Sequence, residues 1–166
     1  MNKQKLNGFI DKYSLGGTVE SVKWISTDNN ISTNFVSEDK TLLGTIKCDD
    51  NQLKEGKYCI YTTSQLKRLL SVLNNDIQVN VKDQDERNIS FHIKDQLMSL
   101  DYILSEESII PKAPKLKQIP IFPIGIRLDD KFITQFIKAK NALPDESNFT
   151  IKSTFENIQV IIGHSN

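Results

Sequence analysis

The residues with acid, base or thiol chemistry are few in this sequence, and they do not form a recognisable catalytic set. His92 alternates with apolar neighbours in a predicted strand, and His164 lies in the terminal tail. Neither histidine has a Cys, Asp or Glu at the spacing that a metal site needs. Cys48 and Cys59 form no CxxC pair, which is typical of reduced thiols rather than of a disulfide. The sequence therefore predicts no metal, no cofactor and no activated nucleophile.

Acidic residues gather where a structural role explains them. Asp129 and Asp130 open a predicted helix, where carboxylates accept hydrogen bonds from free amide groups and favour the helix dipole. The run from Asp83 to Glu86 marks a predicted hairpin tip and lacks the ligand spacing and the glycine of a calcium loop. Gly44 and Gly56 are isolated and belong to no phosphate-binding loop. These residues indicate capping and turns rather than catalysis.

Three amphipathic helices are predicted from apolar residues that recur at helical spacing. The second of them is preceded by Thr62 and Gln65, which have the spacing of a capping box. In chain order the predicted helices span residues 3–14, residues 63–74, and the stretch from the N-cap Asp129 to the residue before Pro144.

Each helix is followed by turn-separated stretches that read as antiparallel strands. The predicted strands are 18–26, 30–37 and 41–48; 77–83, 88–94 and 97–104; 148–153 and 157–163; and leading strands at 58–62 and 124–128. A unit of helix and meander thus occurs twice in full and a third time without its last strand. This repeat predicts an α+β fold, with the first two helices on one side of a continuous sheet and Trp24 in its core.

The repeats divide the chain into three parts. Two full units make a first domain over residues 1–105, and the third unit makes a partial second domain over 124–166. Between them, residues 106–123 hold four of the five prolines, interleaved with lysines. This composition is typical of an extended connector between domains.

Three segments carry a resemblance to a known family: SQLKRLLSVLNNDIQVNVKDQDERNISFHI, the connector PKLKQIPIFP running into IGIRLDDKFITQFIKAKNAL, and the closing hairpin NFTIKSTFENIQVIIG. Over nearly the whole chain the sequence resembles the DNA sliding clamp, specifically that of T4-type bacteriophages. The resemblance implies a sliding-clamp fold and a trimeric ring that encircles duplex DNA without reading its sequence. It also implies a processivity factor without enzyme activity, with the replicative DNA polymerase and an ATP-driven clamp loader as partners.

Clamps of this family continue with a further unit that completes the second domain. We therefore expect the second domain of this chain to be marginal by itself, because a helix with two strands leaves apolar surface and sheet edges uncovered. On this interpretation the 166-residue chain has a well-ordered first domain, and its second region is less ordered or held by contacts with another copy. It does not close the family's ring by itself.

A clamp would turn its helices toward DNA, so cations away from the apolar stripe of each helix are the predicted phosphate contacts. At about 100° per residue, the third helix presents its lysines opposite the stripe, and the first presents them on a flank beside the outward-pointing Asp11. Lysines on the solvent side of any surface helix are the alternative explanation. The predicted DNA-facing residues are Lys5, Lys12, Lys67, Arg68, Lys131 and Lys138.

The connector suggests a second site. In clamps generally, a hydrophobic peptide of the polymerase or another client docks in a groove beside this segment, so Ile119, Ile121 and Phe122 are the predicted groove residues. Packing of the connector against the sheet would account for the same residues equally well.

Charge and hydropathy limit the remaining possibilities. Lys+Arg and Asp+Glu both count 21, so the net charge is zero and a nucleic-acid role requires basic residues gathered on one face. No apolar run is long enough for a membrane span and the first residues lack a signal-peptide pattern, so we expect a cytoplasmic protein. The rival hypothesis is a protein-interaction module of helix and meander repeats that does not bind DNA. A common positive helix face would favour the clamp, and scattered charge would favour the module.

Overall fold

The structure is a computed structural model that describes residues 2–49, 52–85, 87–114, 121–154 and 157–163. The chain divides into two compact units, Met1–Lys117 and Gln118–Asn166, and the division falls inside the predicted connector 106–123. Each unit is described by itself.

In its described residues, the first unit contains two α-helices and seven strands in the order that the repeat predicts. Its elements are α1 (Lys3–Ser14), the short 3-10 turn η1 (Leu15–Gly17), β1 (Val22–Ser26), β2 (Asn30–Val36), β3 (Leu43–Asp49), β4 (Gly56–Ile60), α2 (Thr63–Ser71), β5 (Gln78–Gln84), β6 (Arg87–Lys94), β7 (Ser99–Ile103) and the 3-10 turn η2 (Glu107–Ile109). Helix α1 has the predicted bounds, and α2 ends before the predicted residue 74. Strand β1 begins later than predicted, because the turn after α1 continues to Val19, whose amide bonds the Ser14 carbonyl at 3.1 Å.

The strands form two antiparallel sheets, with the orders β3-β2-β1-β4 and β5-β6-β7. The prediction of one continuous sheet was therefore wrong. The sheets meet where the Ser105 amide donates to the Cys59 carbonyl at 2.9 Å. Beside this bond the Asn88 side chain, rather than a backbone amide, donates to the Lys57 carbonyl at 3.0 Å. The Asn88 side chain thus occupies the carbonyl that a further backbone hydrogen bond between the two sheets would use. The backbone pairing between the sheets therefore does not extend past the Ser105–Cys59 bond.

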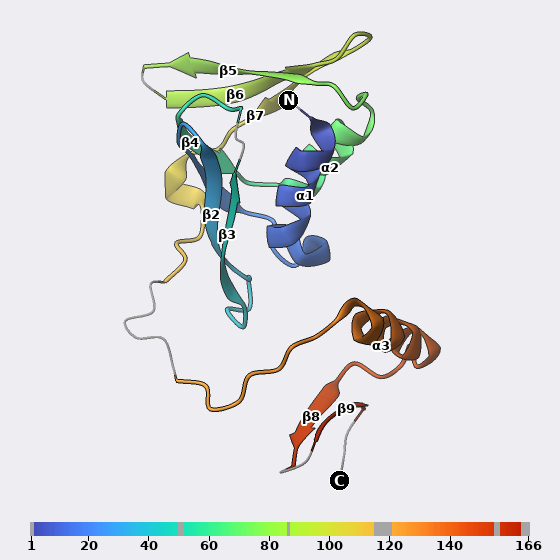
Figure 1. The fold of residues 1–166 in the computed structure, drawn as a ribbon. Coiled ribbons are helices and arrows are strands. Elements are labelled where there is room, and N and C mark those ends of the chain that lie inside the picture. The colour runs from blue at the N-terminus through green and yellow to red at the C-terminus, as the bar shows by residue number, and fades with distance from the viewer. Residues whose placement is uncertain (1, 50–51, 86, 115–120, 155–156, 164–166) are drawn as a thin grey trace. The chain divides into compact units, whose positions relative to one another are not determined.

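Helices α1 and α2 lie next to each other (Figure 1), with α1 against β3 of the first sheet and α2 against β7 of the second, so they do not share one continuous sheet as predicted. Lys3, at the start of α1, donates a hydrogen bond from its ammonium to the Leu73 carbonyl, just past the end of α2. At the opposite end, the Tyr13 hydroxyl lies 3.1 Å from the Thr63 hydroxyl at the start of α2. The two helices therefore run antiparallel.

A single aromatic core joins the helices to both sheets. Trp24 on β1 is 1% exposed, which confirms its predicted core position. Its ring contacts Phe9 of α1 at 5.4 Å between centroids and Phe91 of β6 at 5.9 Å. Ile10 and Leu70 add fully buried aliphatic side chains from the two helices. Burial of this shared apolar surface is the main stabilising term for the unit.

The start of α2 is capped by a residue distant in sequence. The predicted capping box was wrong, because the Thr62 side chain makes no cap hydrogen bond. Instead the Glu20 carboxylate accepts from the Ser64 amide at 2.8 Å. The backbone of Thr62 is held by the Tyr102 hydroxyl, which donates to the Thr62 carbonyl at 3.2 Å. Tertiary contacts therefore satisfy this helix end where local pattern predicted a local cap.

The second unit consists of α3 (Asp130–Ala142) on a hairpin of β8 (Phe149–Ser153) and β9 (Ile158–Ile162). The predicted N-cap is confirmed, since Asp129 accepts from the Phe132 amide at 2.7 Å. The leading strand predicted at 124–128 was wrong: these residues form no ladder. In the first unit the leading strand β4 pairs with β1, whereas β8 and β9 pair with each other. A stretch without a ladder partner does not become a strand.

Candidate nucleic-acid interface

The three helices concentrate positive charge, although the whole chain is neutral. Helix α1 carries three lysines and one aspartate, and α2 carries one lysine and one arginine without an acid. Helix α3 carries three lysines and one aspartate. Each helix therefore has a net charge of +2, which the strands and loops balance. Basic residues gathered on helices are what contact with a phosphate backbone requires.

One of the predicted DNA-facing cations is already paired within the helix layer. The Lys67 ammonium on α2 lies 2.5 Å from the Asp11 carboxylate on α1. This ion pair joins the two antiparallel helices on their solvent side. It offsets the charge of Lys67. Sequence reasoning could not find this pair, because the partners are 56 residues apart.

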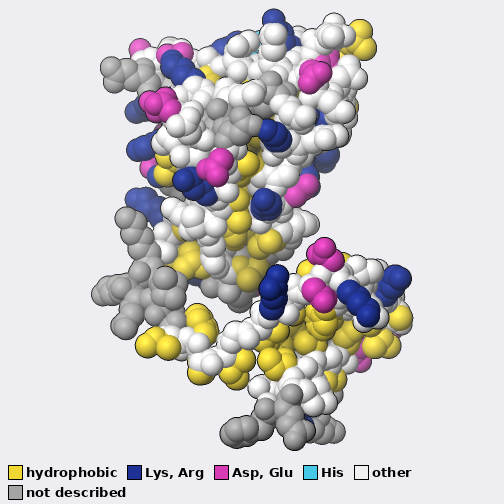
Figure 2. All heavy atoms as spheres, in the orientation of Figure 1, with side chains coloured by type: hydrophobic (Ala, Val, Ile, Leu, Met, Phe, Trp, Pro, Cys, Tyr) yellow, Lys and Arg dark blue, Asp and Glu magenta, His cyan; other side chains and the backbone are white. Residues whose placement is uncertain are grey.

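The other cations of the first unit lie on both sides of that ion pair. Lys5 and Lys12 are exposed on the flank of α1 that turns away from α2 at 100° per residue, while Arg68 is exposed on α2. Figure 2 shows basic side chains with some acidic ones among them over this part of the first unit. The pattern is a positive helix layer interrupted by Asp11 rather than a uniform positive face.

In the second unit, Lys131 and Lys138 are both exposed on α3. They lie on the side opposite Phe132 and Phe136, as the helical spacing predicts. Figure 2 shows hydrophobic side chains in a band below the charged side chains of this unit. The predicted phosphate contacts of α3 are therefore separate from its apolar side.

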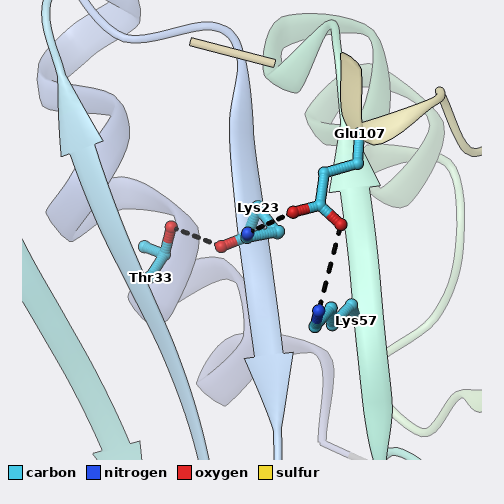
Figure 3. A network of polar contacts seen from close by, with 4 residues as sticks. All are labelled: Lys23, Thr33, Lys57 and Glu107. Carbon is cyan, nitrogen blue, oxygen red and sulfur yellow. Dashed lines mark hydrogen bonds and ion pairs between the residues drawn. The ribbon is translucent and has the colours of Figure 1, made fainter. Parts of the chain in front are cut away.

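The start of the predicted connector is held on the strands by charge. Glu107 in η2 lies 2.6 Å from the Lys23 ammonium on β1 and 4.0 Å from the Lys57 ammonium on β4 (Figure 3). The hydrogen bond from Lys23 holds the pKa of Glu107 below its usual value. The Thr33 hydroxyl donates to the Lys23 carbonyl at 3.0 Å and links this site to β2. Ile110, just after η2, is buried.

Two open cavities flank the segment of residues 107–110 that Glu107 holds on the strands. The larger, about 870 Å³, lies where β4 and the ends of β6 and β7 diverge, and includes Cys59, Ile89, Ile103 and Leu104 in its lining. The smaller, about 630 Å³, includes Tyr61 and Ile109 together with two glutamates. These cavities are surfaces that the sequence did not indicate, because they combine residues from four or more separate elements.

The predicted groove residues have a different environment. Ile119 lies outside the described residues. Ile121 and Phe122 are exposed in the second unit, and neither is part of the lining of the two cavities. The structure therefore brings no two of the three predicted residues into a described groove.

The titratable residues of the strands form a surface network. Asp101 on β7 lies 3.0 Å from the Lys82 ammonium and 3.0 Å from Nδ1 of His92. Hydrogen bonds from Lys82 and then His92 lower the pKa of Asp101. Burial raises the pKa of the Cys59 thiol, which disfavours the reactive thiolate. Within the described ranges, no three His, Cys, Asp or Glu side chains are grouped for a metal ion.

Among the helices of the described part, none has both the length and the apolar character needed to cross a membrane. Comparison of the sequence with protein-family models and with curated proteins found no match.

Proposed function

We propose that this chain is a subunit of a DNA sliding clamp that encircles duplex DNA and tethers a replicative polymerase. The observation that carries the proposal is the charge of the helices. Two antiparallel helices lie together, and each has a net charge of +2 in a chain of net charge zero. The resemblance of the sequence to T4-type clamps supplies the rest of the proposal.

The chemistry of the helix layer suits a protein that moves along DNA. Lysine and arginine side chains contact phosphates without distinguishing bases, because the phosphate backbone carries no direct sequence information. A ring held by topology needs weak contacts of this kind, since tight contacts would slow its movement. The Asp11–Lys67 pair, at 2.5 Å, removes one cation from the layer and so weakens phosphate binding.

The strands offer surfaces for the proposed partners. Strands β3 and β5 are at the edges of their sheets in the described part of the chain, and edge strands of neighbouring subunits could pair to form the proposed trimer. On the connector side, Glu107 holds residues 107–110 beside the two cavities. We place the client peptide of the polymerase and the clamp loader on this side of the first unit.

A protein-interaction module that does not bind DNA is the second candidate. The observation that favours it is the tip of the β6–β7 hairpin, where Leu97 is 84% exposed and Met98 is also exposed. Large apolar side chains at a turn are typical of protein contacts. This candidate predicts that the helix cations can be removed without loss of function.

Binding to duplex DNA of unrelated sequences, measured by fluorescence anisotropy against salt, tests the proposal. The test variant neutralises one exposed cation on each helix: Lys12→Gln, Arg68→Gln and Lys138→Gln. Each lost phosphate contact lowers the slope of log affinity against log salt by about 0.9, so three lost contacts lower it by about 2.7. The control removes the same charge from strands: Lys47→Gln, Lys94→Gln and Lys152→Gln.

The proposal predicts a smaller salt slope for the helix variant and a nearly unchanged slope for the strand variant. It also predicts that only the helix variant shortens the products of a clamp-dependent polymerase. Equal effects of the two variants would show that binding follows net charge alone. Wild-type polymerase processivity with the helix variant would favour the protein-interaction module.

A further inference from the structure

The face of β1 and β4 that turns away from the aromatic core carries two lysines and a thiol. Val22 and Trp24 of β1 are buried in the core, so Lys23 between them points to the other face. On β4, Lys57 and Cys59 alternate with core residues in the same way. The ladder between the two strands places Cys59 directly opposite Lys23. The two lysines and the thiol therefore lie together on this outer face of the first sheet.

Residues 106–110, the cover segment, lie over this outer face. The Glu107 carboxylate is 2.6 Å from the Lys23 ammonium and 4.0 Å from the ammonium of the other lysine (Figure 3). Cys59 and Ile110 are both buried, although neither belongs to the apolar core that joins the helices to the sheets. Their burial indicates a second, smaller contact between the cover segment and the outer face.

The attachments of the cover segment to the strands are weak. Its ion pairs are solvent-exposed, since the side chains of Glu107 and Lys57 are 51% and 65% exposed, and exposed pairs contribute little to stability. Of its two isoleucines, Ile110 is buried but Ile109 is more than half exposed. The amides of both isoleucines donate to carbonyls three residues earlier, within the same turn. The cover segment can therefore leave the outer face without breaking a strand ladder, as is typical of regions that open locally.

The cover segment separates the two open cavities. Residues 106–108 line the larger cavity, and Ile109 lines the smaller one. Displacement of the segment would therefore join the cavities into one groove over the outer face. It would also remove Glu106 and Glu107 from the described lining of the larger cavity, which then keeps more cations than acids. The charged residues that remain there are Lys54, Lys57, Arg87, Glu55 and Asp83.

The chemistry of the cover segment indicates what this groove would bind. Its Glu107 carboxylate contacts two lysines, and three residues later the branched apolar side chain of Ile110 is buried. We propose that the cover segment is an internal ligand, and that an acidic segment of a protein partner displaces it. The partner supplies the same combination, a carboxylate followed by a branched apolar residue, to Lys23 and Lys57. A basic segment would instead be repelled by the two lysines once Glu107 has moved away.

This inference rests on the proposed function in placing a protein partner on this side of the first unit. It involves neither DNA nor the cations of the helices. The experiments below therefore contain no DNA and no polymerase, and their failure would leave the salt-slope test of DNA binding unaffected. Failure of the salt-slope test would likewise leave the peptide measurements unaffected.

The first experiment measures binding of a fluorescent peptide, LSEESIIP, which has the sequence of residues 104–111. Fluorescence anisotropy is recorded against the concentration of the full chain. In the wild type the cover segment competes at a high effective concentration, so we expect weak binding. The released variant, Glu107→Gln with Ile110→Ser, should bind the peptide at least about tenfold more tightly. Glu107→Gln alone, which keeps the buried isoleucine, should give an intermediate affinity.

Two lysine variants locate the binding site. Lys23→Gln added to the released variant should abolish the gain in affinity. Lys47→Gln, at an exposed lysine of β3, makes the same charge change and should leave the gain intact. Far-UV circular dichroism and the fluorescence of Trp24 show whether each variant is folded. A peptide in which both glutamates are replaced by glutamine should bind the released variant several-fold more weakly than LSEESIIP.

The thiol of Cys59 reports whether the peptide occupies the outer face. With Cys48→Ser as the background, Cys59 should react slowly with a maleimide while the cover segment is in place, and faster in the released variant. LSEESIIP should slow the reaction again, whereas sodium sulfate should not. Equal peptide affinity of the wild type and the released variant, or unchanged affinity on Lys23→Gln, would overturn the proposal. Protection of Cys59 by sulfate would overturn it as well, because the groove would then bind small anions rather than an acidic peptide.

Discussion

Neutralising Asp11 should strengthen binding to duplex DNA, because this carboxylate occupies the Lys67 ammonium at 2.5 Å. The substitution Asp11→Asn keeps the size of the side chain and removes its charge. Lys67 then becomes available for one additional phosphate contact. One contact makes the slope of log affinity against log salt steeper by about 0.9. Between 50 and 200 mM salt this corresponds to about a 3.5-fold larger loss of affinity.

The cost to stability should be small. Both side chains of the pair are more than a third exposed, and exposed ion pairs contribute about 0.2–1 kcal/mol. Urea unfolding followed by tryptophan fluorescence, with Trp24 as the reporter, should therefore give nearly the wild-type midpoint. An increase in DNA affinity could then be assigned to charge at the helix layer rather than to a change of fold.

Fluorescence anisotropy with a labelled duplex over a salt series measures the predicted slope. Asp85→Asn is the matched control, because it makes the same charge change at the β5–β6 hairpin, and its slope should equal that of the wild type. Arg68→Gln should make the slope shallower by about 0.9, whereas Lys67→Gln should change it little. If Asp11→Asn and Asp85→Asn behave alike, the α1–α2 layer does not face DNA and the argument from the helices is refuted.

Three further predictions concern the fold that presents these surfaces. Glu107→Gln should increase hydrogen exchange in the segment that follows β7, and acid should have the same effect on the wild type. Because the pKa of Glu107 is lowered in the folded state, its stabilising contribution is present above the ordinary value of 4.5 and is lost as the pH falls through the lower folded value. Glu20→Ala should destabilise the protein to urea by about 1 kcal/mol through loss of the α2 cap, with Gln65→Ala as the neutral control. Leu70→Ala, at a fully buried position, should cost about 2–5 kcal/mol in the same assay, whereas Val72→Ala, at an exposed one, should stay within about 0.5 kcal/mol of wild type.

The local sequence pattern was sufficient to predict most of the helices and strands. The spacing of Leu6, Phe9 and Ile10 predicted α1 with its observed bounds, and Asp129 predicted the cap of α3. These features depend on residues within one or two turns of each other. Because the residues that set these helix bounds and caps are close in sequence, a single sequence is enough to predict them.

The errors that change the arrangement of elements involve partners that are distant in sequence. The α2 cap comes from Glu20 and not from the adjacent Thr62. The apolar residues at 124–128 have the composition of a strand but no ladder partner, and the sheets separate where Asn88 occupies a carbonyl of β4. The same limit affected the candidate site, since the pairing of Lys67 with Asp11 requires knowledge of how α1 and α2 pack.

Acidic residues that accept hydrogen bonds at turns help to explain how a chain of net charge zero can carry three basic helices. Asp39 accepts hydrogen bonds from the Ser37 hydroxyl and the Thr41 amide, and Asp95 accepts from the amides of Asn74 and Leu97. These bonds lower the pKa of both carboxyls. Turns require such acceptors, whereas the solvent sides of helices do not, so the negative charge collects at strand ends and the positive charge remains on the helices. The contribution of these turns is fully present above the ordinary pKa of 3.8 and is lost only as the pH falls through the lower folded values. The separation of charge therefore has the same origin as the hairpins: the carboxylates that close the turns also leave the helices positive.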